Sequence, residues 1–396
     1  MRAVVLRSHG GPEVLTIEEV ADPTASNEEL VVDVEHAALN RADILQRMGL
    51  YPDPRRREFE IPGLEYSGVV SATGADVTGW SVGDRVMGIE AGGCYAEKVV
   101  THARQALPVP DAIASADAAA IPEVFLTAWD ALVVQGGLTS GRWALVHAGA
   151  SGVGTAAIQI AKAIGARIVV TCSAGKMDAC RALGADVVLE RSPSDWLAAL
   201  GEQLPGGVDV ILDVIGGEET TRNLQAAQMD GTIVQVGLMG GANASVNVGL
   251  ILAKRITWIG TTLRARPIER KLALSQRFIA EMLPLFESRA LHAVVDSRYA
   301  FDDIAAAHQH MESNANVGKI LIDISSISRR SIGTGCDRSL FPDDLASQCH
   351  RHQAAQEHDN ENGDCNGEQH GRQRVQRSGA PAEHPELHCA ERVQQG

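Results

Sequence analysis

The chain has 396 residues, of which 45% are hydrophobic, and a formal net charge of −15. Its length allows two domains with full hydrophobic cores. The acidic balance argues against nucleic acid and anionic membranes as main partners, because both need a basic face. Seven scattered cysteines without a C-x-x-C pair predict a reducing compartment. There is no charged-then-apolar leader and no long apolar run, so we expect a cytoplasmic protein.

Residues 1–122 carry short apolar runs separated by turn signals such as Gly10-Gly11-Pro12. Such runs predict β-strands, so this segment is interpreted as a β-rich domain. A short helix is predicted at 40–48, with Asn40 in the capping position and Asp43 in the first turn. The predicted strands are 3–6, 15–20, 29–39, 65–72, 85–88 and 96–100.

Residues 123–263 alternate nearly continuous apolar runs with helical patterns. Apolar strands of this kind belong to a parallel sheet that helices cover on both faces. Six strands linked by crossovers predict a doubly wound, dinucleotide-binding Rossmann sheet, and hence an α/β fold. The predicted strands are 144–147, 167–172, 187–189, 208–214, 232–236 and 256–261, and the predicted helices are 155–164, 176–183, 196–200 and 218–225.

The run 143–154 has the order strand, turn of small residues, helix. Glycines permit a tight turn and a close approach of the backbone to a pyrophosphate, and the first helical turn offers unpaired N–H groups to that charge. The spacing Gly149-x-x-Gly152-x-Gly154 departs from the strict fingerprint, so an ordinary strand–helix connection is the alternative for this motif alone. The candidate phosphate-binding residues are Gly149, Ser151, Gly152, Val153 and Gly154.

Residues 264–324 return to a mixed pattern. An amphipathic helix is predicted at 269–286, a strand at 294–299, a second helix at 301–311 and a last strand at 319–324. We expect this segment to rejoin the first domain.

The composition changes from about residue 325 onward: Lys319 is the last lysine, and six of the thirteen histidines and four of the seven cysteines follow. Such a segment cannot bury enough apolar area to offset its ordering entropy, so 325–396 is interpreted as a disordered tail. An out-of-frame read-through beyond Ile324 would explain it, and the adjacent frames of the coding DNA test that idea. The alternative is a metal-binding tail, although no spacing matches a zinc module. Its ligands would be Cys336, Cys349, His350, His352, Cys365 and Cys389.

Several short motifs occur along the chain, at 40–43, 63–68, 83–86, 120–122 with 126–129, 147–154, 237–241 and 316–320. Their order is that of the medium-chain dehydrogenase/reductase superfamily. Within it, the chain resembles the zinc-independent quinone oxidoreductase family, whose type member reduces quinones with NADPH. The resemblance implies a GroES-like catalytic domain at 1–122, a Rossmann NADPH-binding domain at 123–263, and a return to the catalytic domain at 264–324; the tail lies outside it.

The resemblance also bears on metal. Zinc-dependent relatives hold a catalytic zinc with Cys, His and a second Cys or Asp, and many hold a structural zinc with four cysteines. The matching positions here read Asn40-Arg41 and Leu64, and Cys94 is the one cysteine between Met87 and Val99. Catalytic zinc needs about three protein ligands and structural zinc four. We therefore predict no metal, which disfavours alcohol oxidation and suits quinone reduction.

The candidate catalytic residues are Asn40, Asp43 and Tyr51. A quinone accepts hydride readily, so hydrogen bonds to its developing oxyanion would suffice. Tyr51 lies in 49–52, which resembles the family's substrate loop, and its ring suits a flat substrate. The alternatives stay open: Asn40 as a plain helix cap, Asp43 as a charge that serves the helix dipole, and Tyr51 as a surface side chain.

The cofactor is predicted from the end of the second Rossmann strand. NAD-binding folds place a carboxylate about 20 residues after the glycines, whereas Ser173 and Lys176 occur here. With Arg191, these residues predict binding of a 2′-phosphate, and hence NADPH; plain solvated charges are the alternative. In the family a lysine at the position of Lys176 has this role, whereas tyrosine is frequent at that of Arg191. The resemblance adds further contacts at Thr127, Leu238, Met239, Gly240 and Asn316.

Three functions compete. The first is a metal-free NADPH:quinone oxidoreductase. The second is an NADPH-dependent alkene or enoyl-thioester reductase, in which Arg264 and Arg266 would serve an acidic substrate. The third is a non-catalytic NADPH-binding or RNA-binding protein, which the acidic charge disfavours. The apolar edge strand 256–263 predicts a homodimer through that edge, as in the superfamily, and His147 is predicted to be a satisfied core residue.

Overall fold

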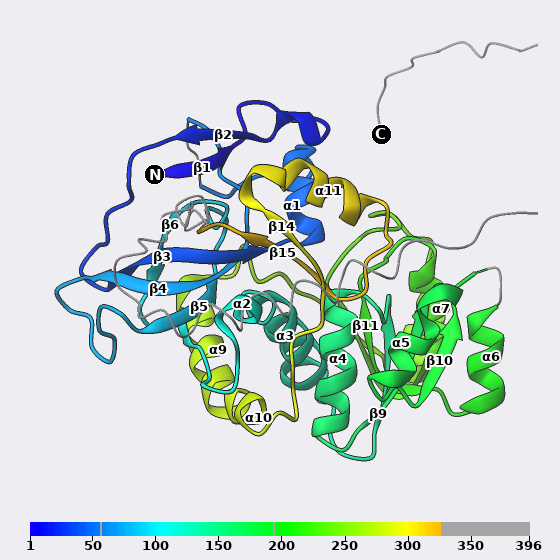
Figure 1. The fold of residues 1–396 in the computed structure, drawn as a ribbon. Helices are drawn as coiled ribbons and strands as arrows, with labels where there is room; N and C mark the ends of the chain where they lie inside the picture. The colour runs from blue at the N-terminus through cyan, green and yellow to red at the C-terminus, as the bar shows by residue number, and fades with distance from the viewer. Residues whose placement is uncertain (56–57, 193–194, 326–396) are drawn as a thin grey trace, which may run out of the picture. The chain divides into compact units, whose positions relative to one another are not determined.

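The computed structural model describes residues 1–55, 58–192 and 195–325. Two sheets organise them, each with its own helices, and α3 and the α9–α10 pair lie at the junction between the two sheets (Figure 1). The predicted tail lies outside the described residues apart from Ser325, and so do its candidate metal ligands, Cys336, Cys349, His350, His352, Cys365 and Cys389.

The first sheet has six strands in the order β10-β9-β8-β11-β12-β13, and every neighbouring pair is parallel. The chain starts in the middle at β8, winds outward to β10, then returns to β11 and winds the other way. This confirms the predicted α/β doubly wound fold. The strands are β8 (Trp143–His147), β9 (Arg167–Cys172), β10 (Val187–Glu190), β11 (Val208–Asp213), β12 (Ala227–Gln235) and β13 (Thr257–Gly260).

Helices cover both faces of this sheet because alternate strand residues point to opposite sides. Val146 of β8 packs into the cluster with α3 and α4, whereas its neighbour Leu145 packs with α6 and α7. The helices of this region are α3 (Pro122–Trp129), α4 (Gly152–Ala163), α5 (Met177–Ala182), α6 (Trp196–Gln203), α7 (Glu219–Ala226) and α8 (Val248–Lys254), with the short helical turns η2 (Asp130–Gln135) and η3 (Ala174–Lys176).

The second sheet has the order β14-β15-β3-β4-β5-β7, with β6 paired to β3. β15 lies antiparallel to β3, with Leu321 opposite Ala38, so the last strand of the described chain joins the sheet of the first domain. Its strands are β3 (Glu29–Ala38), β4 (Glu65–Thr73), β5 (Arg85–Ile89), β6 (Lys98–His102), β7 (Leu107–Pro108), β14 (Val295–Ala300) and β15 (Lys319–Asp323).

Smaller elements surround this second sheet (Figure 1). A two-stranded ribbon at the N-terminus pairs Arg2 with Glu19. The remaining elements are β1 (Arg2–Val5), η1 (Pro12–Val14), β2 (Thr16–Glu19), α1 (Arg41–Arg47), α2 (Ser115–Ala118), α9 (Ile268–Glu281), α10 (Leu283–Glu287), η4 (Phe301–Asp303) and α11 (Ile304–Glu312).

The helix predictions need correction at several points. The helix predicted at 269–286 is two helices, α9 and α10, because Pro284 cannot donate an N–H to continue the first one. The helix predicted at 155–164 begins earlier, at Gly152, where the capping side chain of Ser151 starts it. Helices α3 and α8 were not predicted, since their residues are apolar without clear helical periodicity.

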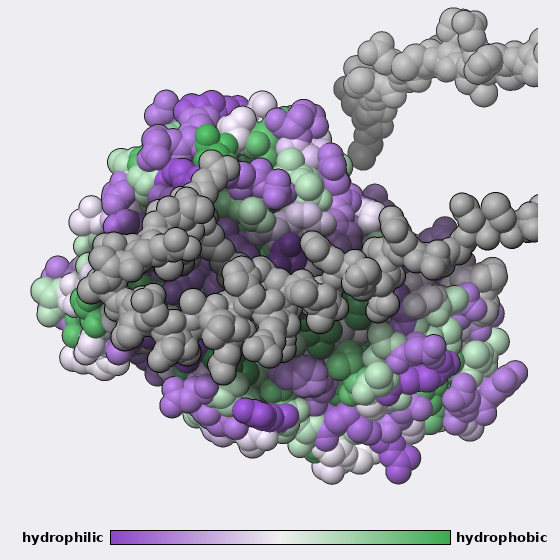
Figure 2. Space-filling view, viewed as in Figure 1, coloured by the Kyte–Doolittle hydropathy of each residue, from purple (hydrophilic) through white to green (hydrophobic). Residues whose placement is uncertain are grey.

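Aromatic pairs connect α3 with the α9–α10 pair. Phe125 meets Phe286 edge to face with ring centroids 4.8 Å apart, and Trp129 meets Phe278 at 5.7 Å. The same apolar cluster includes Met87 of the second sheet, so one core spans both sheets. The surface in Figure 2 is mostly polar and charged, with apolar residues in smaller patches between.

Candidate functional site

The glycine turn places a helix N-terminus at the end of β8. Ser151 Oγ accepts a hydrogen bond of 3.1 Å from the N–H of Gly154. A Cβ at Gly154 would lie 2.4 Å from the carbonyl oxygen of Ala148, so no larger residue fits there. The N–H groups of Gly152 and Val153 have no acceptor within the helix because they belong to its first turn. The turn therefore suits a phosphate anion.

His147, Asn223 and Asp213 form a buried chain of hydrogen bonds, which we call the turn cluster. His147 Nε2 lies 2.7 Å from Asn223 Oδ1, and its Nδ1 lies 2.9 Å from a threonine hydroxyl of β9. Asn223 Nδ2 donates to Asp213 Oδ2 at 3.0 Å. Asp213 Oδ1 accepts the N–H groups of Ile215 and Gly216 at 2.6 and 3.1 Å. His147 is thus a satisfied core residue, as predicted, and the cluster fixes the turn after β11.

The strip Leu238, Met239 and Gly240 lies beside that turn. The N–H of Met239 donates to Val214 O at 3.2 Å, and that of Gly240 to Ile215 O at 2.7 Å. The side chains of Leu238 and Met239 stay 54% and 51% exposed. Large apolar side chains left uncovered beside a fixed turn can pack against a flat ring. The structure thus leaves the predicted cofactor strip accessible.

Of the side chains predicted to hold the 2′-phosphate, Ser173 and Arg191 are exposed and Lys176 is half-buried. Lys176 Nζ donates to the carbonyl oxygens of Asn314 and Asn316 at 2.7 and 2.6 Å, and burial lowers its pKa. The ammonium group has three donors, so one remains for a ligand. The Asn316 side chain donates to Gly318 O at 2.9 Å and so shapes the loop that Lys176 holds.

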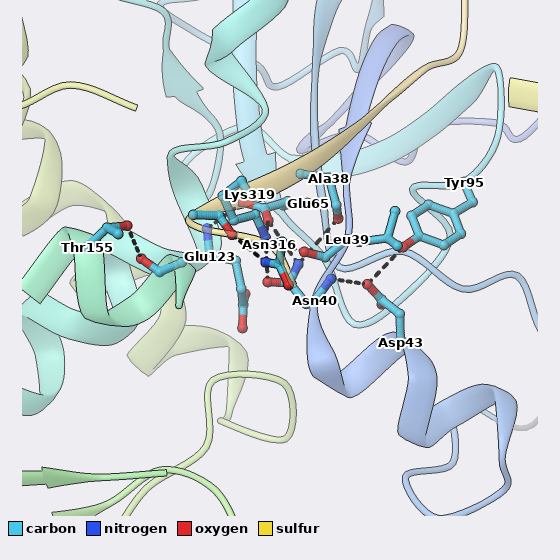
Figure 3. Close-up of polar contacts among 12 residues, drawn as sticks. Ala38, Leu39, Asn40, Asp43, Glu65, Tyr95, Glu123, Thr155, Asn316 and Lys319 are labelled. Carbon is cyan, nitrogen blue, oxygen red and sulfur yellow. Dashed lines mark hydrogen bonds and ion pairs between the residues drawn. The ribbon is translucent and has the colours of Figure 1, made fainter. Parts of the chain in front are cut away.

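Asn40, Glu65 and Lys319 form a second buried group, which we call the junction cluster (Figure 3). Lys319 Nζ lies 2.6 Å from Glu65 Oε1 and donates to Asn40 Oδ1 at 2.7 Å and to the carbonyl oxygen of Leu39. Asn40 Nδ2 donates to Glu65 Oε1 at 2.8 Å. Lys319 is 3% exposed and Glu65 is fully buried. The cluster joins β15, β4 and the start of α1 around one buried ion pair.

The structure changes the expected role of Asp43. This carboxylate is fully buried, and its Oδ2 accepts the N–H of Asn40 at 2.7 Å and the hydroxyl of Tyr95 at 2.9 Å. Its Oδ1 has no partner among the residues that the structure describes. Burial raises the pKa of Asp43 to about 6. This environment suits a positioning role at the start of α1, which is close to the helix-dipole alternative, better than direct contact with a substrate.

Glu123 and Thr127 lie on α3, one helical turn apart, and both are half-buried. The N–H of Glu123 donates to Glu65 Oε2 at 2.8 Å, which attaches α3 to the junction cluster. Burial, followed by the charge of Glu65, raises the pKa of Glu123 to about 8. Sequence reasoning missed Glu123, Glu65 and Lys319 as site residues. The order Pro122-Glu123 marks a helix start but does not show what the helix faces.

Tyr51 is held by Arg264, which lies in the loop between β13 and α9. Arg264 is 7% exposed and donates to Gln46 Oε1 at 2.8 Å and to two backbone carbonyls, one of them that of Tyr51. Its guanidinium lies 4.8 Å from the centroid of the Tyr51 ring. Arg266 pairs with Asp130 at 2.6 Å. The expectation that these arginines serve an acidic substrate is corrected, because internal partners hold both.

The positions that hold zinc ligands in zinc-dependent relatives carry unsuitable side chains here. Leu64 is a buried apolar residue and Asn40 is taken up by the junction cluster. Within residues 1–55, 58–192 and 195–325, no group of three His, Cys, Asp or Glu residues is arranged to hold a metal ion. No described helix is long and apolar enough to cross a bilayer.

Two family models match the chain. Residues 26–111 match the alcohol dehydrogenase GroES-like domain, and residues 152–282 match the zinc-binding dehydrogenase domain. Together with the fold, these matches decide the family. The chain belongs to the medium-chain dehydrogenase/reductase superfamily. The second model's name implies nothing about zinc in this superfamily member, because its match leaves out Asn40 and Leu64.

Solved structures of other superfamily members resemble the chain along most of their length. A mycobacterial protein complexed with NADPH is 30% identical, with 81% of this chain and 99% of that one covered and a TM-score of 0.74. Escherichia coli quinone oxidoreductase complexed with NADPH is 29% identical, with 82% and 100% covered and a TM-score of 0.74. CurK enoyl reductase is 25% identical, with 81% and 98% covered and a TM-score of 0.73. The chain is thus similar to two proteins solved with NADPH, one of them a quinone oxidoreductase, and to an enoyl reductase.

Proposed function

We propose that the protein is an NADPH-dependent, metal-free quinone oxidoreductase. The observation that carries this proposal is the junction cluster. An ammonium group, Lys319 Nζ, lies 2.6 Å from Glu65 and 2.7 Å from Asn40, beside the positions where zinc-dependent relatives bind their metal. The side chains of Asn40, Glu65 and Lys319 are already bonded to one another, so they are not free to ligate a divalent cation, and activation of an alcohol by zinc does not suit this site. A quinone needs no such activation.

The cofactor proposal rests on two features of the chain. The glycine turn offers free N–H groups at the start of α4, and β9 is followed by Ser173 and Lys176 rather than by a carboxylate. A partly buried ammonium suits a 2′-phosphate better than a ribose hydroxyl. The NADPH in the mycobacterial and Escherichia coli structures supports the same choice.

Bound NADPH would supply the hydride, and the residues of the chain would position the acceptor. We propose that Tyr51, held by Arg264, packs against or hydrogen-bonds to the quinone ring. Asn40 and Asp43 hold the start of α1, because both ends of the Asn40 side-chain amide are engaged and Asp43 accepts the backbone N–H of Asn40.

Reduction of an alkene or an enoyl thioester is the second candidate, and the likeness to CurK enoyl reductase favours it. An enoyl-thioester substrate would carry an acidic carrier group, which a quinone lacks. Arg264 and Arg266 are already held inside the protein, so they do not provide the cationic entrance that such a carrier needs.

We also propose a homodimer through β13, which is the last strand of its sheet in the described chain. Its outer edge is unpaired there, and Trp258 on this strand is 41% exposed. Pairing two copies along this edge would satisfy the free backbone groups. Analytical ultracentrifugation tests this proposal: the wild type should sediment as a dimer and Trp258→Glu as a monomer. A monomeric wild type would contradict the proposal.

The function is tested by following NADPH oxidation with ortho-quinones, para-quinones, enones and enoyl thioesters, with NADH as the comparison. We expect the highest kcat/KM with a quinone and a clear preference for NADPH. Tyr51→Phe should lower kcat/KM for quinones about tenfold through loss of one hydrogen bond. Tyr299→Phe, which removes a hydroxyl that lies 3.0 Å from His310 Nδ1, is the matched control.

Three results would contradict the proposal. Faster turnover of enoyl thioesters than of every quinone would favour the second candidate function, reduction of an alkene or enoyl thioester. Tight NADPH binding without turnover of any acceptor would favour a non-catalytic protein. Loss of activity in the presence of a chelator, restored by zinc, would contradict the metal-free mechanism.

A further inference from the structure

We propose that Glu123 is the proton donor to the quinone oxygen during reduction, a role that rests on the proposed function. Hydride transfer alone leaves the quinone as a hydroquinone monoanion, which needs a proton to become the neutral product. The acid must therefore lie between the bound cofactor and the substrate-positioning residues. Among the described residues, we assign this position to Glu123.

The first observation is the packing of α3 against the cofactor helix. A Cβ built on Gly152, the first residue of α4, would lie 2.8 Å from Val124 Cγ1 and 2.7 Å from Lys319 Cδ. Val124 follows Glu123 directly, so the first turn of α3 touches the glycine turn. On its other side, the N–H of Glu123 is fixed to Glu65 at 2.8 Å. Glu123 thus lies between the glycine turn and the junction cluster (Figure 3).

The second observation is that the Glu123 carboxyl is uncommitted. The hydrogen bond of this residue to Glu65 uses its backbone N–H, and no described residue hydrogen-bonds to its side chain. The side chain is half-buried and not sealed in the core. Tyr51 lies near enough that, after burial and Arg264, the charge of Glu123 affects the pKa of its phenol and raises it. The carboxyl is therefore free to serve a ligand that Tyr51 holds.

The third observation is the balance of charges that face Glu123. Glu65 of β4 and Asp43 of α1 disfavour its ionised form, whereas Lys319 of β15 and Lys271 of α9 favour it. Lys319 is already paired with Glu65, and Lys271 donates to the carbonyl oxygen of Arg264 at 2.9 Å. Burial outweighs both lysines and raises the pKa of Glu123 to about 8. The group is therefore mostly protonated at pH 7 and loses its proton above pH 8.

The other acids near the site are less suitable. Burial raises the pKa of Tyr51 above its usual range, which makes its phenol a weaker acid. Asp43 is fully buried at the start of α1 and does not reach a ligand. Lys319 donates to Asn40 and Leu39 and pairs with Glu65, so its ammonium donors are used.

Bound NADPH would supply the hydride, that is two electrons and one hydrogen nucleus, and would itself become NADP⁺. The O–H bond of the Glu123 acid breaks, and a new O–H bond forms on the anionic oxygen of the hydroquinone. Glu123 is left as a carboxylate, which takes a proton from water before the next cycle.

The test compares wild type, Glu123→Gln and Glu123→Asp with NADPH and one para-quinone. Wild-type kcat should fall as the pH rises through about 8. Glu123→Gln should lower kcat about 10²-fold, abolish the fall of kcat near pH 8 and leave NADPH affinity unchanged. Glu123→Asp should restore part of kcat, and its kcat should fall at a different pH. Glu269→Gln replaces an exposed first-turn glutamate of α9 and should behave as wild type.

Infrared spectra give a readout that does not need turnover. At pH 7 the wild type should show the carbonyl stretch of a buried carboxylic acid that Glu123→Gln lacks. If quinones are reduced and Glu123→Gln keeps wild-type kcat and pH profile, or if the acid band does not depend on Glu123, the donor role alone is overturned. If the wild type reduces no quinone, the proposed function is overturned and the donor role with it.

Discussion

The turn cluster and the junction cluster are both buried polar groups at the ends of strands, but they differ in charge. In the turn cluster a histidine, an amide and an aspartate satisfy one another and two backbone N–H groups. The junction cluster encloses a lysine–glutamate pair, and Asp43 beside it keeps an oxygen without a partner among the described residues. Neighbouring Glu123 has a pKa raised to about 8.

This difference separates a structural role from a chemical one. A fully satisfied network makes one conformation rigid and offers no group that can change its bonds. A buried ion pair with an uncommitted carboxyl beside it, here that of Glu123, leaves a group that can transfer a proton to a substrate oxygen. We therefore expect the turn cluster to control cofactor geometry, and the junction cluster to control stability and proton transfer.

The largest effect is expected from Lys319→Met. The substitution leaves Glu65 buried without its ion-pair partner, which costs about 3–5 kcal/mol in the free energy of unfolding. Denaturant unfolding measures it. The control is the double variant Lys319→Met with Glu65→Gln, which removes both charges and should recover much of the stability. If the double variant is no more stable than the single one, the buried charge is not the cause.

The second effect is expected from Asp213→Ala in the turn cluster. The substitution leaves the N–H groups of Ile215 and Gly216 and the amide of Asn223 without their acceptor. It should lower the free energy of unfolding by about 2–3 kcal/mol. Because this turn lies beside the 238–240 strip, the Kd for NADPH should rise several-fold while kcat at saturating NADPH changes little.

Asp209→Ala is the matched control for that variant. Asp209 lies on the same strand, β11, and accepts the N–H of Trp143 at 2.8 Å near the opposite end. It should lose stability but keep NADPH affinity. An equal loss of affinity in both variants would show that the turn cluster has no local effect on the cofactor.

The doubly wound sheet could be predicted from the sequence because each of its strands is a nearly continuous apolar run. The observed β9, Arg167–Cys172, coincides with the predicted strand. The two helices α9 and α10 were predicted as one because apolar periodicity continues through Met282, and only Pro284 reveals the break. Local patterns thus identify elements better than their ends.

The candidate site was harder to predict, because its key contacts join residues that are distant in sequence. Lys319 and Glu65 are 254 positions apart by their numbers, and nothing local marks either as half of a buried pair. The same holds for Arg264 and Tyr51: the sequence suggests the arginine as a ligand only for the acidic substrate of the second candidate function, whereas in the structure it donates to the backbone of Tyr51. The glycine turn was predictable because its residues are contiguous.

The third effect concerns Lys176, which donates to the loop before β15. Lys176→Ala should raise the Kd for NADPH about tenfold and leave that for NADH nearly unchanged, since a charge-assisted contact with the 2′-phosphate is lost. Fluorescence titration with each nucleotide measures the ratio. Lys162→Ala, which removes a surface pair with Asp186, is the control. An equal rise in the Kd for NADPH and for NADH would show that Lys176 acts only by holding Asn314 and Asn316.

The smallest effect concerns Glu90, a half-buried carboxyl after β5 that accepts a hydrogen bond of 2.9 Å from Gln105. Burial raises its pKa to about 7. An acid with a raised pKa binds more protons in the folded state, so its ionisation lowers stability as the pH rises from about 4.5 to above 7. Glu90→Gln removes this cost, and the amide can still accept from Gln105.

We therefore expect Glu90→Gln to be more stable than wild type by about 1–2 kcal/mol at pH 8, with partial exposure of the side chain reducing the gain. At pH 4 the gain should vanish, because Glu90 is then protonated in both folded and unfolded chains. Thermal unfolding at several pH values measures this trend, with the exposed Glu269→Gln as control. If Glu90→Gln is more stable than wild type by the same amount at pH 4 and pH 8, packing rather than ionisation causes the difference. Glu90 would then have a purely structural role, like the residues of the turn cluster.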